Sequence, residues 1–302
     1  MPARTKMPHY PAGRRFLEFS QVVQDGLFKN YIAQMQGVAA MAGEDKPFLV
    51  WAGDNRRSFS IPTLVRSRTI EHPGLGVLQR FRPPPRVPET RDLTESDIPF
   101  RDKADRLVWR GMTTGRFHAA PGELGYGPRY YVARALKRID DPSVDIGYSS
   151  RVQHSLMSRK TRADVDAAMR PSLLVEEMLK ARYILSLEGN DIATGLRWAL
   201  HSNSCVVMPA PTAESWLMEA QLVPMEHYVP VAPNLHNLAA TLAWCRSNIG
   251  ECEKIAANGR EFMARLLDED SETALSAEVA KTFFSKVKLV PKAGSAFPDT
   301  LF

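Results

Sequence analysis

Residues 182–231 read RYILSLEGNDIATGLRWALHSNSCVVMPAPTAESWLMEAQLVPMEHYVPV, and this block decides the fold of the chain. The apolar run Tyr183 to Leu187 predicts a buried strand, and the Gly-Asn-Asp cluster that follows predicts a turn. A helix is expected from Thr194 to Ser202, and a second strand from Ser204 to Met208. This arrangement brings backbone amides and a helix N-terminus to one edge of a sheet, where they can meet a phosphate.

The rest of the chain continues the alternation of strands and helices. Further strands are expected at Phe48 to Ala52, Leu64 to Arg68, Leu107 to Trp109, Asp145 to Tyr148 and Tyr228 to Val231. Helices are expected at Phe16 to Met41, Tyr130 to Ile139, Arg162 to Lys180 (interrupted by Pro171), Ala213 to Ala220, Leu235 to Ser247 (with Asn234 as N-cap), Glu251 to Leu267 and Thr273 to Val287. Alternating strands and helices predict an α/β architecture with parallel sheets.

Length and composition indicate a water-soluble globular protein. The 302 residues leave room for two ordinary domains or one large one, and 44% of them are apolar. No apolar run approaches the roughly 20 residues of a membrane span, and the N-terminus lacks the apolar core of a secretory signal. Three cysteines, Cys205, Cys245 and Cys252, fit neither a disulfide framework nor a structural zinc site. We therefore expect a cytoplasmic protein.

Positive charge is concentrated in the first part of the chain. Residues 1–116 hold 19 Lys and Arg against 12 Asp and Glu, whereas the remainder holds 20 against 22. Fifteen of those 19 basic residues are arginine, which binds phosphate and carboxylate groups through two parallel hydrogen bonds. An anionic substrate, an anionic membrane surface or nucleic acid would each suit this charge, as would a solvated basic surface without a partner.

The turn after the first strand of the opening block is a candidate binding site. It comprises Glu188, Gly189, Asn190 and Asp191, with Arg197 a little further along. In open parallel sheets, ligands bind outside the carboxyl ends of the strands, and a glycine lets the backbone approach them closely. The same residues also fit an ordinary helix cap followed by a surface arginine, so the pattern leaves both interpretations open.

A second candidate follows the expected strand at Leu107 to Trp109. It reads RGMTTGR and contains Arg110, Gly111, Thr113, Thr114 and Arg116. Two arginines, two hydroxyls and two glycines after a strand can form an anion cradle. The segment has neither the GxxxxGK[ST] nor the GxGxxG spacing, so an ordinary polar turn remains the alternative.

Asp54 follows the expected strand at Phe48 to Ala52 and could serve as a general base. Asp54-Asn55 is also a favoured turn pair, which leaves a purely structural role open. The seven histidines form no metal-binding pattern, and Asp164-Val165-Asp166 is interpreted as a solvated helix face. No metal or cofactor is therefore predicted.

Several motifs occur together in the order of a known family. They are Lys103…Trp109-Arg110-Gly111…Thr114…Arg116, Val144-Asp145-Ile146-Gly147-Tyr148, Lys180-Ala181-Arg182-Tyr183, Ser202-Asn203-Ser204, Ser215-Trp216, Leu222…Pro224…His227-Tyr228-Val229-Pro230-Val231 and Ile255-Ala256…Gly259…Phe262. On these motifs the chain resembles the CAP10/LpsA-type glycosyltransferases, a group related to the protein O-glucosyltransferases that act on EGF repeats. The sequence LEGNDIAT…SNS is most similar to that of the bacterial lipopolysaccharide-core members.

The resemblance implies a GT-B fold, with two Rossmann-like domains that face each other across a cleft. On this basis we expect an N-terminal acceptor-side domain over residues 1–125, a C-terminal donor-binding domain over 126–290 whose last helix can pack back on the first, and a loose tail over 291–302. It further implies metal-independent, inverting transfer from a nucleotide-sugar donor, usually a UDP-sugar. Arg110 through Arg116 would then lie near the diphosphate, while Gly189, Arg197 and Ser202-Asn203-Ser204 would contact the nucleotide-sugar.

Asp54 resembles the family's base, although its neighbours Asn55-Arg56-Arg57 depart from the eukaryotic pattern. We thus predict a hexosyltransferase that acts on a lipopolysaccharide-core or other surface-glycan acceptor, in the cytoplasm and peripheral on the inner membrane. Alternatives are an inactive or differently specific GT-B protein and a basic nucleic-acid-binding protein. The last lacks interleaved aromatics and any nucleic-acid-binding motif, so we expect no nucleic-acid partner.

Overall fold

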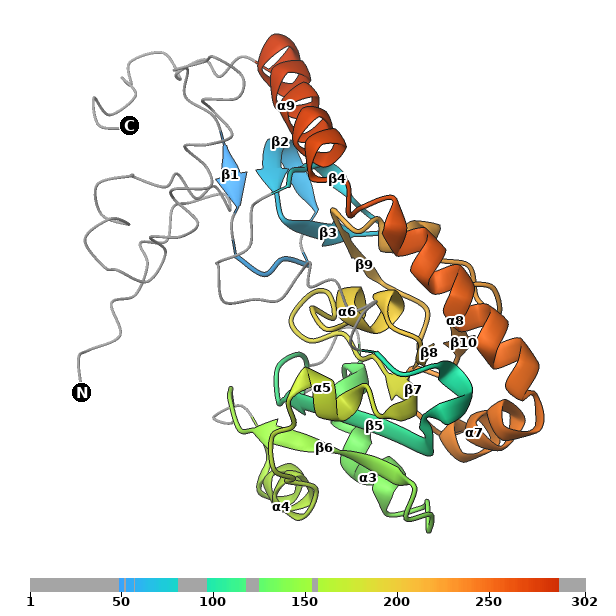
Figure 1. Ribbon diagram of the computed structural model, residues 1–302. Coiled ribbons are helices and arrows are strands. Elements are labelled where there is room, and N and C mark those ends of the chain that lie inside the picture. The colour runs from blue at the N-terminus through green and yellow to red at the C-terminus, as the bar shows by residue number, and fades with distance from the viewer. Residues whose placement is uncertain are drawn as a thin grey trace.

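The computed structural model describes residues 49–51, 53–56, 58–80, 97–117, 125–153 and 157–287 (Figure 1). The expected helix at Phe16 to Met41 and the tail over 291–302 lie outside these ranges. Within them the chain forms two parallel sheets with helices packed against them, so the predicted α/β class is confirmed.

A parallel five-stranded sheet is the larger of the two parallel sheets in the described residues. Its strands are β5 (Ala104–Met112), β6 (Val144–Ser150), β7 (Ala181–Leu185), β8 (Cys205–Met208) and β10 (Val229–Pro230). They lie in the order β10-β8-β7-β5-β6, and every neighbouring pair is parallel. The chain leaves β5 for β6 on one side and then crosses to β7 on the other. Strand order therefore reverses between β5 and β7, and ligands of open α/β sheets bind at the carboxyl ends of the strands at such a point.

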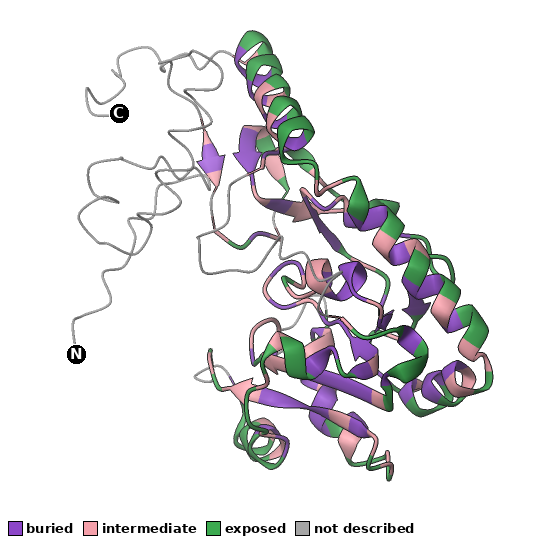
Figure 2. Ribbon diagram, in the orientation of Figure 1, coloured by how far each residue is buried: buried purple, intermediate pink, exposed green. Residues whose placement is uncertain are grey.

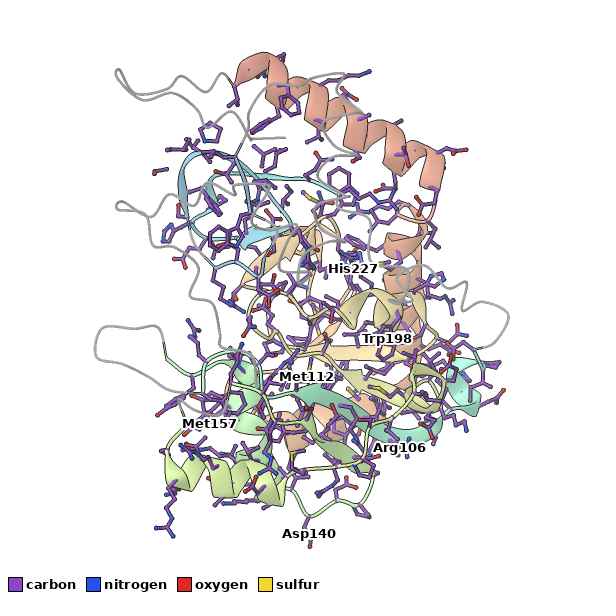
Figure 3. The ribbon with its side chains drawn as sticks, turned by 90° about the vertical axis from the view of Figure 1, so that its left-hand side faces the viewer. Arg106, Met112, Asp140, Met157, Trp198 and His227 are labelled. Carbon is purple, nitrogen blue, oxygen red and sulfur yellow. The ribbon has the colours of Figure 1, made fainter. Side chains whose placement is uncertain are left out.

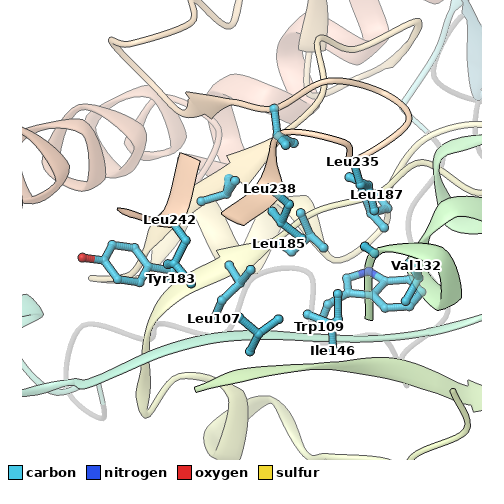
Figure 4. Packing of buried hydrophobic residues seen from close by; sticks show 14 of the residues in the cluster. Leu107, Trp109, Val132, Ile146, Tyr183, Leu185, Leu187, Leu235, Leu238 and Leu242 are labelled. Atoms are coloured by element: carbon cyan, nitrogen blue, oxygen red, sulfur yellow. The ribbon is translucent and has the colours of Figure 1, made fainter. Parts of the chain in front are cut away.

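Helices cover both faces of this sheet. In chain order they are α3 (Val132–Leu136, preceded by the 3-10 turn Pro128–Tyr131), α4 (Arg159–Ala167), α5 (Val175–Met178), α6 (Leu196–His201), α7 (Leu238–Ser247) and α8 (Ile249–Ala264). Alternate residues along the strands enter two separate apolar clusters. Leu107 and Trp109 pack with α3 and α7, whereas Val108 between them packs with α5 and α6. Figure 2 shows the strands buried between the helices, and Figure 4 shows the first cluster.

A smaller parallel sheet precedes it. It consists of β1 (Val50–Trp51), β2 (Phe59–Val65) and β4 (Gly74–Leu78), with β2 in the middle. A short strand after β2, β3 (Ser67–Thr69), pairs antiparallel with β9 (Ala213–Ser215) from the C-terminal half.

The last helix, α9 (Glu269–Lys286), runs beside the smaller sheet (Figure 1). Gln79 Nε2 donates to Ser276 Oγ over 2.6 Å, and Arg80 forms an ion pair with Glu269 at 2.8 Å. The two halves of the chain are therefore joined both by the β3–β9 pair and by α9.

The strand pairing changes the expected domain boundary. Leu107 of β5 pairs with Val144 of β6 and with Tyr183 of β7, so residues 104–112 belong to the C-terminal sheet. The boundary therefore precedes β5 rather than falling at residue 125. As a consequence, Arg110 to Arg116 and Glu188 to Arg197 follow strands of one sheet and do not face each other from separate domains.

The expected helix at Ala213 to Ala220 is wrong. The chain forms β9 there, followed by the 3-10 turn Glu219–Gln221. The tertiary contacts override helix propensity, because β9 pairs with β3 and the Ala213 amide donates to the Glu188 carboxylate over 3.1 Å. Helix α6 is also shorter than expected, so it offers only a small dipole at its N-terminus.

Candidate active site

The loops after β5 and β7 meet at the point where strand order reverses. Gly115 N donates to Asn190 Oδ1 over 2.8 Å. Gly115 has φ 97°, and a Cβ there would lie 2.9 Å from Gly189 O, so both the conformation and the contact require glycine. A Cβ on Gly189 would lie 2.6 Å from Thr114 Oγ1. The structure thus brings the two predicted segments together, and their glycines allow the close packing.

Arg129, in the 3-10 turn before α3, joins these two loops. Its Nη1 donates to Thr114 Oγ1 over 2.6 Å and to Met112 O over 3.0 Å, while Nε and Nη2 donate to Leu187 O over 3.2 and 3.1 Å. Burial lowers the pKa of Arg129 to about 10, although Asp191 acts in the opposite direction. A partly buried cation whose acceptors here are carbonyl and hydroxyl oxygens retains a strong attraction for an anion.

Sequence reasoning missed Arg129 because it lies outside both motifs. The segment Gly127-Pro128-Arg129 gives one usable signal, since Pro128 at the first position of the turn marks a helical start. That signal predicts local structure but not the proximity of Arg129 to Leu187, which depends on the strand order.

The side chains of Arg110 and Thr113 have mainly structural contacts. Arg110 Nη2 donates to Asp145 Oδ1 over 2.6 Å, and its Nε donates to Pro171 O over 2.8 Å. Thr113 is buried, and its hydroxyl donates to Val152 O over 2.6 Å. The charge of Arg110 is therefore neutralised by Asp145, although Arg110 also borders a pocket together with Trp109 and Arg129.

Residues of the β7–α6 loop border two pockets. The wide pocket has a volume of about 420 Å³ and is bordered by Trp109, Gly111, Arg129, Thr194, Arg197 and Trp198, among others. Met112 and Trp198, both on its wall, are labelled in Figure 3. The narrow pocket, of about 100 Å³, is bordered by Arg56, Arg116, Tyr126, Glu188, Thr212 and Glu219, among others. The wide pocket has the size of a small-molecule site.

Glu188 and Asp191 hold the β7–α6 loop in place. Glu188 Oε1 accepts hydrogen bonds from Thr212 N over 2.7 Å and from Ala213 N over 3.1 Å. Asp191 is buried and accepts a hydrogen bond from Ser67 Oγ over 2.7 Å. Burial raises the pKa of Asp191, and the neighbouring charge of Asp54 adds to this effect. These two carboxylates fix the loop against β3 and β9, and leave Gly189 and Asn190 at its tip.

Asp54 lies against the tip of the same loop. It follows β1, is exposed, and its Oδ2 accepts a hydrogen bond from Asn190 Nδ2 over 2.9 Å. Asp54 and Arg129 thus contact residues only three positions apart, Asn190 and Leu187. The candidate base and Arg129 thus contact the same loop, between β7 and α6.

Ser202, Asn203 and Ser204 lie at the opposite edge of the sheet. Ser204 Oγ donates to the carbonyl of Ala181, the first residue of β7, over 2.8 Å. Asn203 N donates to Asp97 Oδ2 over 2.5 Å, and Ser202 Oγ donates within α6. Because these residues precede β8, they stand at its amino end, and none of them borders either pocket. We therefore remove them from the candidate site.

A parallel α/β sheet with an arginine-containing pocket at its switch point is an arrangement that can bind an anionic small molecule. Residues 146–290 match the family model described as glycosyl transferase family 90. This match, together with the similarity to a bacterial O-glucosyltransferase, confirms the resemblance that the motifs indicated.

Individual relatives are similar to the chain over part of its length. The chain is 30% identical over 189 residues to the O-glucosyltransferase LpsA of Dichelobacter nodosus, covering 62% of this chain and 52% of LpsA. It is 34% identical over 182 residues to the uncharacterized protein 035R of Invertebrate iridescent virus 3, covering 57% of this chain and 16% of that protein. The chain thus spans about half the length of LpsA and a smaller share of the viral protein.

Solved structures with some similarity include HepE of Anabaena in complex with UDP and glucose, with 12% identity, a TM-score of 0.48, and coverage of 89% of this chain and 81% of that one. Sucrose-phosphate synthase of Thermosynechococcus elongatus is another, with 14% identity, a TM-score of 0.42, and coverage of 74% of this chain and 53% of that one.

In the part of the chain that the structure describes, no helix is long and apolar enough to cross a membrane.

Proposed function

We propose that this chain transfers a hexosyl group from a nucleotide-sugar, a UDP-hexose, to a hydroxyl group of a lipopolysaccharide core or another surface glycan. The observation that carries the proposal is Arg129, which joins the two loops at the switch point in a chain whose residues 146–290 match the model of glycosyl transferase family 90. The name of the bacterial relative, an O-glucosyltransferase, supports transfer to a hydroxyl group.

On the donor side, the diphosphate would lie next to Arg129 and the loop tip at Gly189. The arginine stabilises the negative charge that develops on the departing phosphate oxygen as the bond to the sugar breaks. Arg197 borders the same wide pocket from α6 and adds a second positive group. The indoles of Trp109 and Trp198 border the pocket as well and offer flat surfaces for a base or a sugar ring.

On the acceptor side, Asp54 would act as the general base. It takes the proton of the acceptor hydroxyl while that oxygen attacks the anomeric carbon from the face opposite the diphosphate. A new carbon–oxygen bond forms, the anomeric carbon–phosphate oxygen bond breaks, and its electron pair leaves with the nucleoside diphosphate. Attack from the opposite face inverts the configuration. Two arginines near the leaving group would allow the reaction to proceed without a metal ion.

We further propose that the two sheets are the two halves of a GT-B enzyme, with the acceptor bound between them. The smaller sheet carries Asp54, and the larger sheet carries the donor site. The positive charge of the first 116 residues suits an acceptor with phosphates or acidic sugars, presented at the anionic cytoplasmic surface of the inner membrane.

The proposal is tested by incubating the purified chain with a panel of UDP-, GDP- and ADP-hexoses and with lipopolysaccharide-core acceptors. We expect one UDP-hexose to support transfer, with unchanged rates in excess EDTA and an inverted anomeric centre in the product by NMR. Transfer that requires a divalent cation would contradict metal independence. Failure to bind any nucleotide-sugar would contradict the proposed function.

A further inference from the structure

We infer that Arg56 is a positioning residue that holds the loop after β1, which contains Asp54, in a fixed position against the β7–α6 loop. This inference deepens the proposed function on which it rests. Arg56 lies two residues after Asp54, and its side chain reaches the β7–α6 loop. Its Nε donates to Asn190 O over 2.8 Å, and its Nη2 donates to Asp191 O over 2.9 Å. Arg56 thus binds the main chain of the residue whose side chain binds Asp54.

The guanidinium also contacts two further groups. Nη2 donates to Glu188 Oε2 over 2.8 Å, and Nη1 donates to Thr212 Oγ1 over 2.7 Å. Glu188 in turn accepts hydrogen bonds from the amides of Thr212 and Ala213. One side chain therefore links three segments that are far apart in sequence: the loop after β1, the loop after β7 and the start of β9.

The residue between Asp54 and Arg56 is anchored as well. Asn55 is buried, and its Nδ2 donates to Ser67 O over 3.2 Å, while Ser67 Oγ donates to Asp191. Each of the three consecutive residues Asp54, Asn55 and Arg56 thus has a contact that leads to the 190–191 segment. Such repeated attachment fixes the Asp54 carboxylate relative to the loop tip, which matters because a shift of about 1 Å can lower a rate by roughly 10²-fold.

Arg68 provides a matched control. It also links the smaller sheet to the C-terminal half, through Glu214 at 2.8 Å, and it donates to Gly76 O over 2.9 Å. Its side chain is 26% exposed and that of Arg56 is 24% exposed, so the two ion pairs lie at similar depths. Arg68 contacts Glu214 of β9 and Gly76 of β4, and neither contact involves residues 54–56 or 188–191.

The experiment compares R56Q, R56K and R68Q in the full chain. We measure kcat and KM at saturating acceptor, the donor Kd by calorimetry, thermal unfolding, and hydrogen exchange of the amides of residues 53–56 and 188–191. For R56Q we expect kcat to fall at least about 10-fold, with the donor Kd changed less than about 3-fold and faster exchange in both segments. R56K should recover part of kcat, because one ammonium can replace only some of the four hydrogen bonds. R68Q should lower the unfolding temperature as much as R56Q does, but it should change neither kcat nor the exchange rates of residues 53–56 and 188–191.

Three results would overturn the inference: equal kcat in R56Q and R68Q, equal loss of kcat and donor affinity in R56Q, or unchanged exchange in both segments of R56Q. The exchange measurement requires neither donor nor acceptor. If the wild-type chain bound no nucleotide-sugar, the proposed function would fail, while exchange in R56Q would still decide whether Arg56 holds the two loops together.

Discussion

Asn190 donates a hydrogen bond from Nδ2 to Asp54 Oδ2 over 2.9 Å, although 136 residues separate the two in the chain. The same Asn190 side chain accepts a hydrogen bond from Gly115 N through Oδ1. One amide thus joins the loop after β1, the loop after β5 and the loop after β7. Because Arg129 binds Leu187 three residues earlier, the candidate base and the candidate anion-binding arginine contact the same loop.

Replacement of Asp54 by Asn tests the assignment of the base. The amide keeps the size of the side chain but cannot take a proton, so we expect transfer to fall by about 10²- to 10⁴-fold. Donor affinity by calorimetry should stay within about 3-fold, since Asp54 does not border the wide pocket. Glu71→Gln serves as the control, because Glu71 is an exposed acid of the smaller sheet's periphery. Equal transfer rates in D54N and E71Q would remove Asp54 from the mechanism.

Gly189→Ala tests the close packing of the two switch-point loops. The added methyl group would lie 2.6 Å from Thr114 Oγ1 and 3.1 Å from Arg129 Cζ, so the loop or the arginine must move. We expect donor affinity to weaken about 10-fold and the free energy of unfolding to fall by about 1–3 kcal/mol.

Gly250→Ala is its matched control, because a Cβ there has no heavy atom within 4 Å and the residue lies in α8. That variant should be more stable by roughly 0.5–1 kcal/mol, with unchanged donor affinity. A G189A protein with wild-type affinity would show that the loop tip does not approach the donor.

Asn203→Ala tests the conclusion that residues 202–204 do not belong to the donor site. Its Nδ2 donates to Asp97 O over 3.3 Å and to Ile98 O over 3.2 Å, at the amino edge of the sheet. We expect the free energy of unfolding in urea to fall by about 1 kcal/mol while donor affinity stays the same. A loss of donor affinity greater than the loss seen in G189A would restore the original prediction.

Asp141→Asn tests one electrostatic contribution to stability. Hydrogen bonds from Arg246, and then from Ser143, lower the pKa of Asp141 to about 2. A folded-state pKa below the unfolded value stabilises the folded protein above about pH 4, and this stabilisation disappears as the pH falls through 2.

Since the side chain is 28% exposed, we expect the wild type to exceed D141N by only about 1 kcal/mol at pH 7. Urea unfolding should show this difference shrinking between pH 4 and 3. The exposed neighbour Asp140, labelled in Figure 3, provides the control variant D140N, which should match the wild type. A constant difference between wild type and D141N over this range would contradict the assignment.

Strands of the larger sheet could be predicted where a short apolar run lies next to turn residues, as at Leu107 to Trp109 and Cys205 to Met208. Leu107 to Trp109 lies within β5, whereas Tyr183 to Leu187 extends two residues beyond the end of β7 at Leu185. The two switch-point loops could be predicted for the same reason, since they follow directly after these runs. What the pattern does not contain is strand order, and the placement of β5 in the C-terminal sheet moved the expected boundary.

The errors arise where tertiary contacts decide. Ala213 to Ala220 has helix-forming residues, but pairing with β3 draws its first part into a strand. Ser202 to Ser204 lie between α6 and β8, in the sequence block expected to bind the donor. Because they precede β8, they lie at the amino ends of the parallel strands, whereas ligands bind at the carboxyl ends. Arg129 was missed because its role depends on contacts with Leu187, 58 residues away.

The central claim, a nucleotide-diphosphate site at Arg129, is tested most directly by calorimetric titration of UDP into the wild type and R129Q. Glutamine keeps a donor for the loop carbonyls but lacks the charge, which burial already disfavours in the folded state. We predict that the wild type binds one UDP per chain and that R129Q, titrated well below its unfolding temperature, binds it at least about 10-fold more weakly. Equal UDP affinity in the two proteins, or no binding by the wild type, would contradict this site.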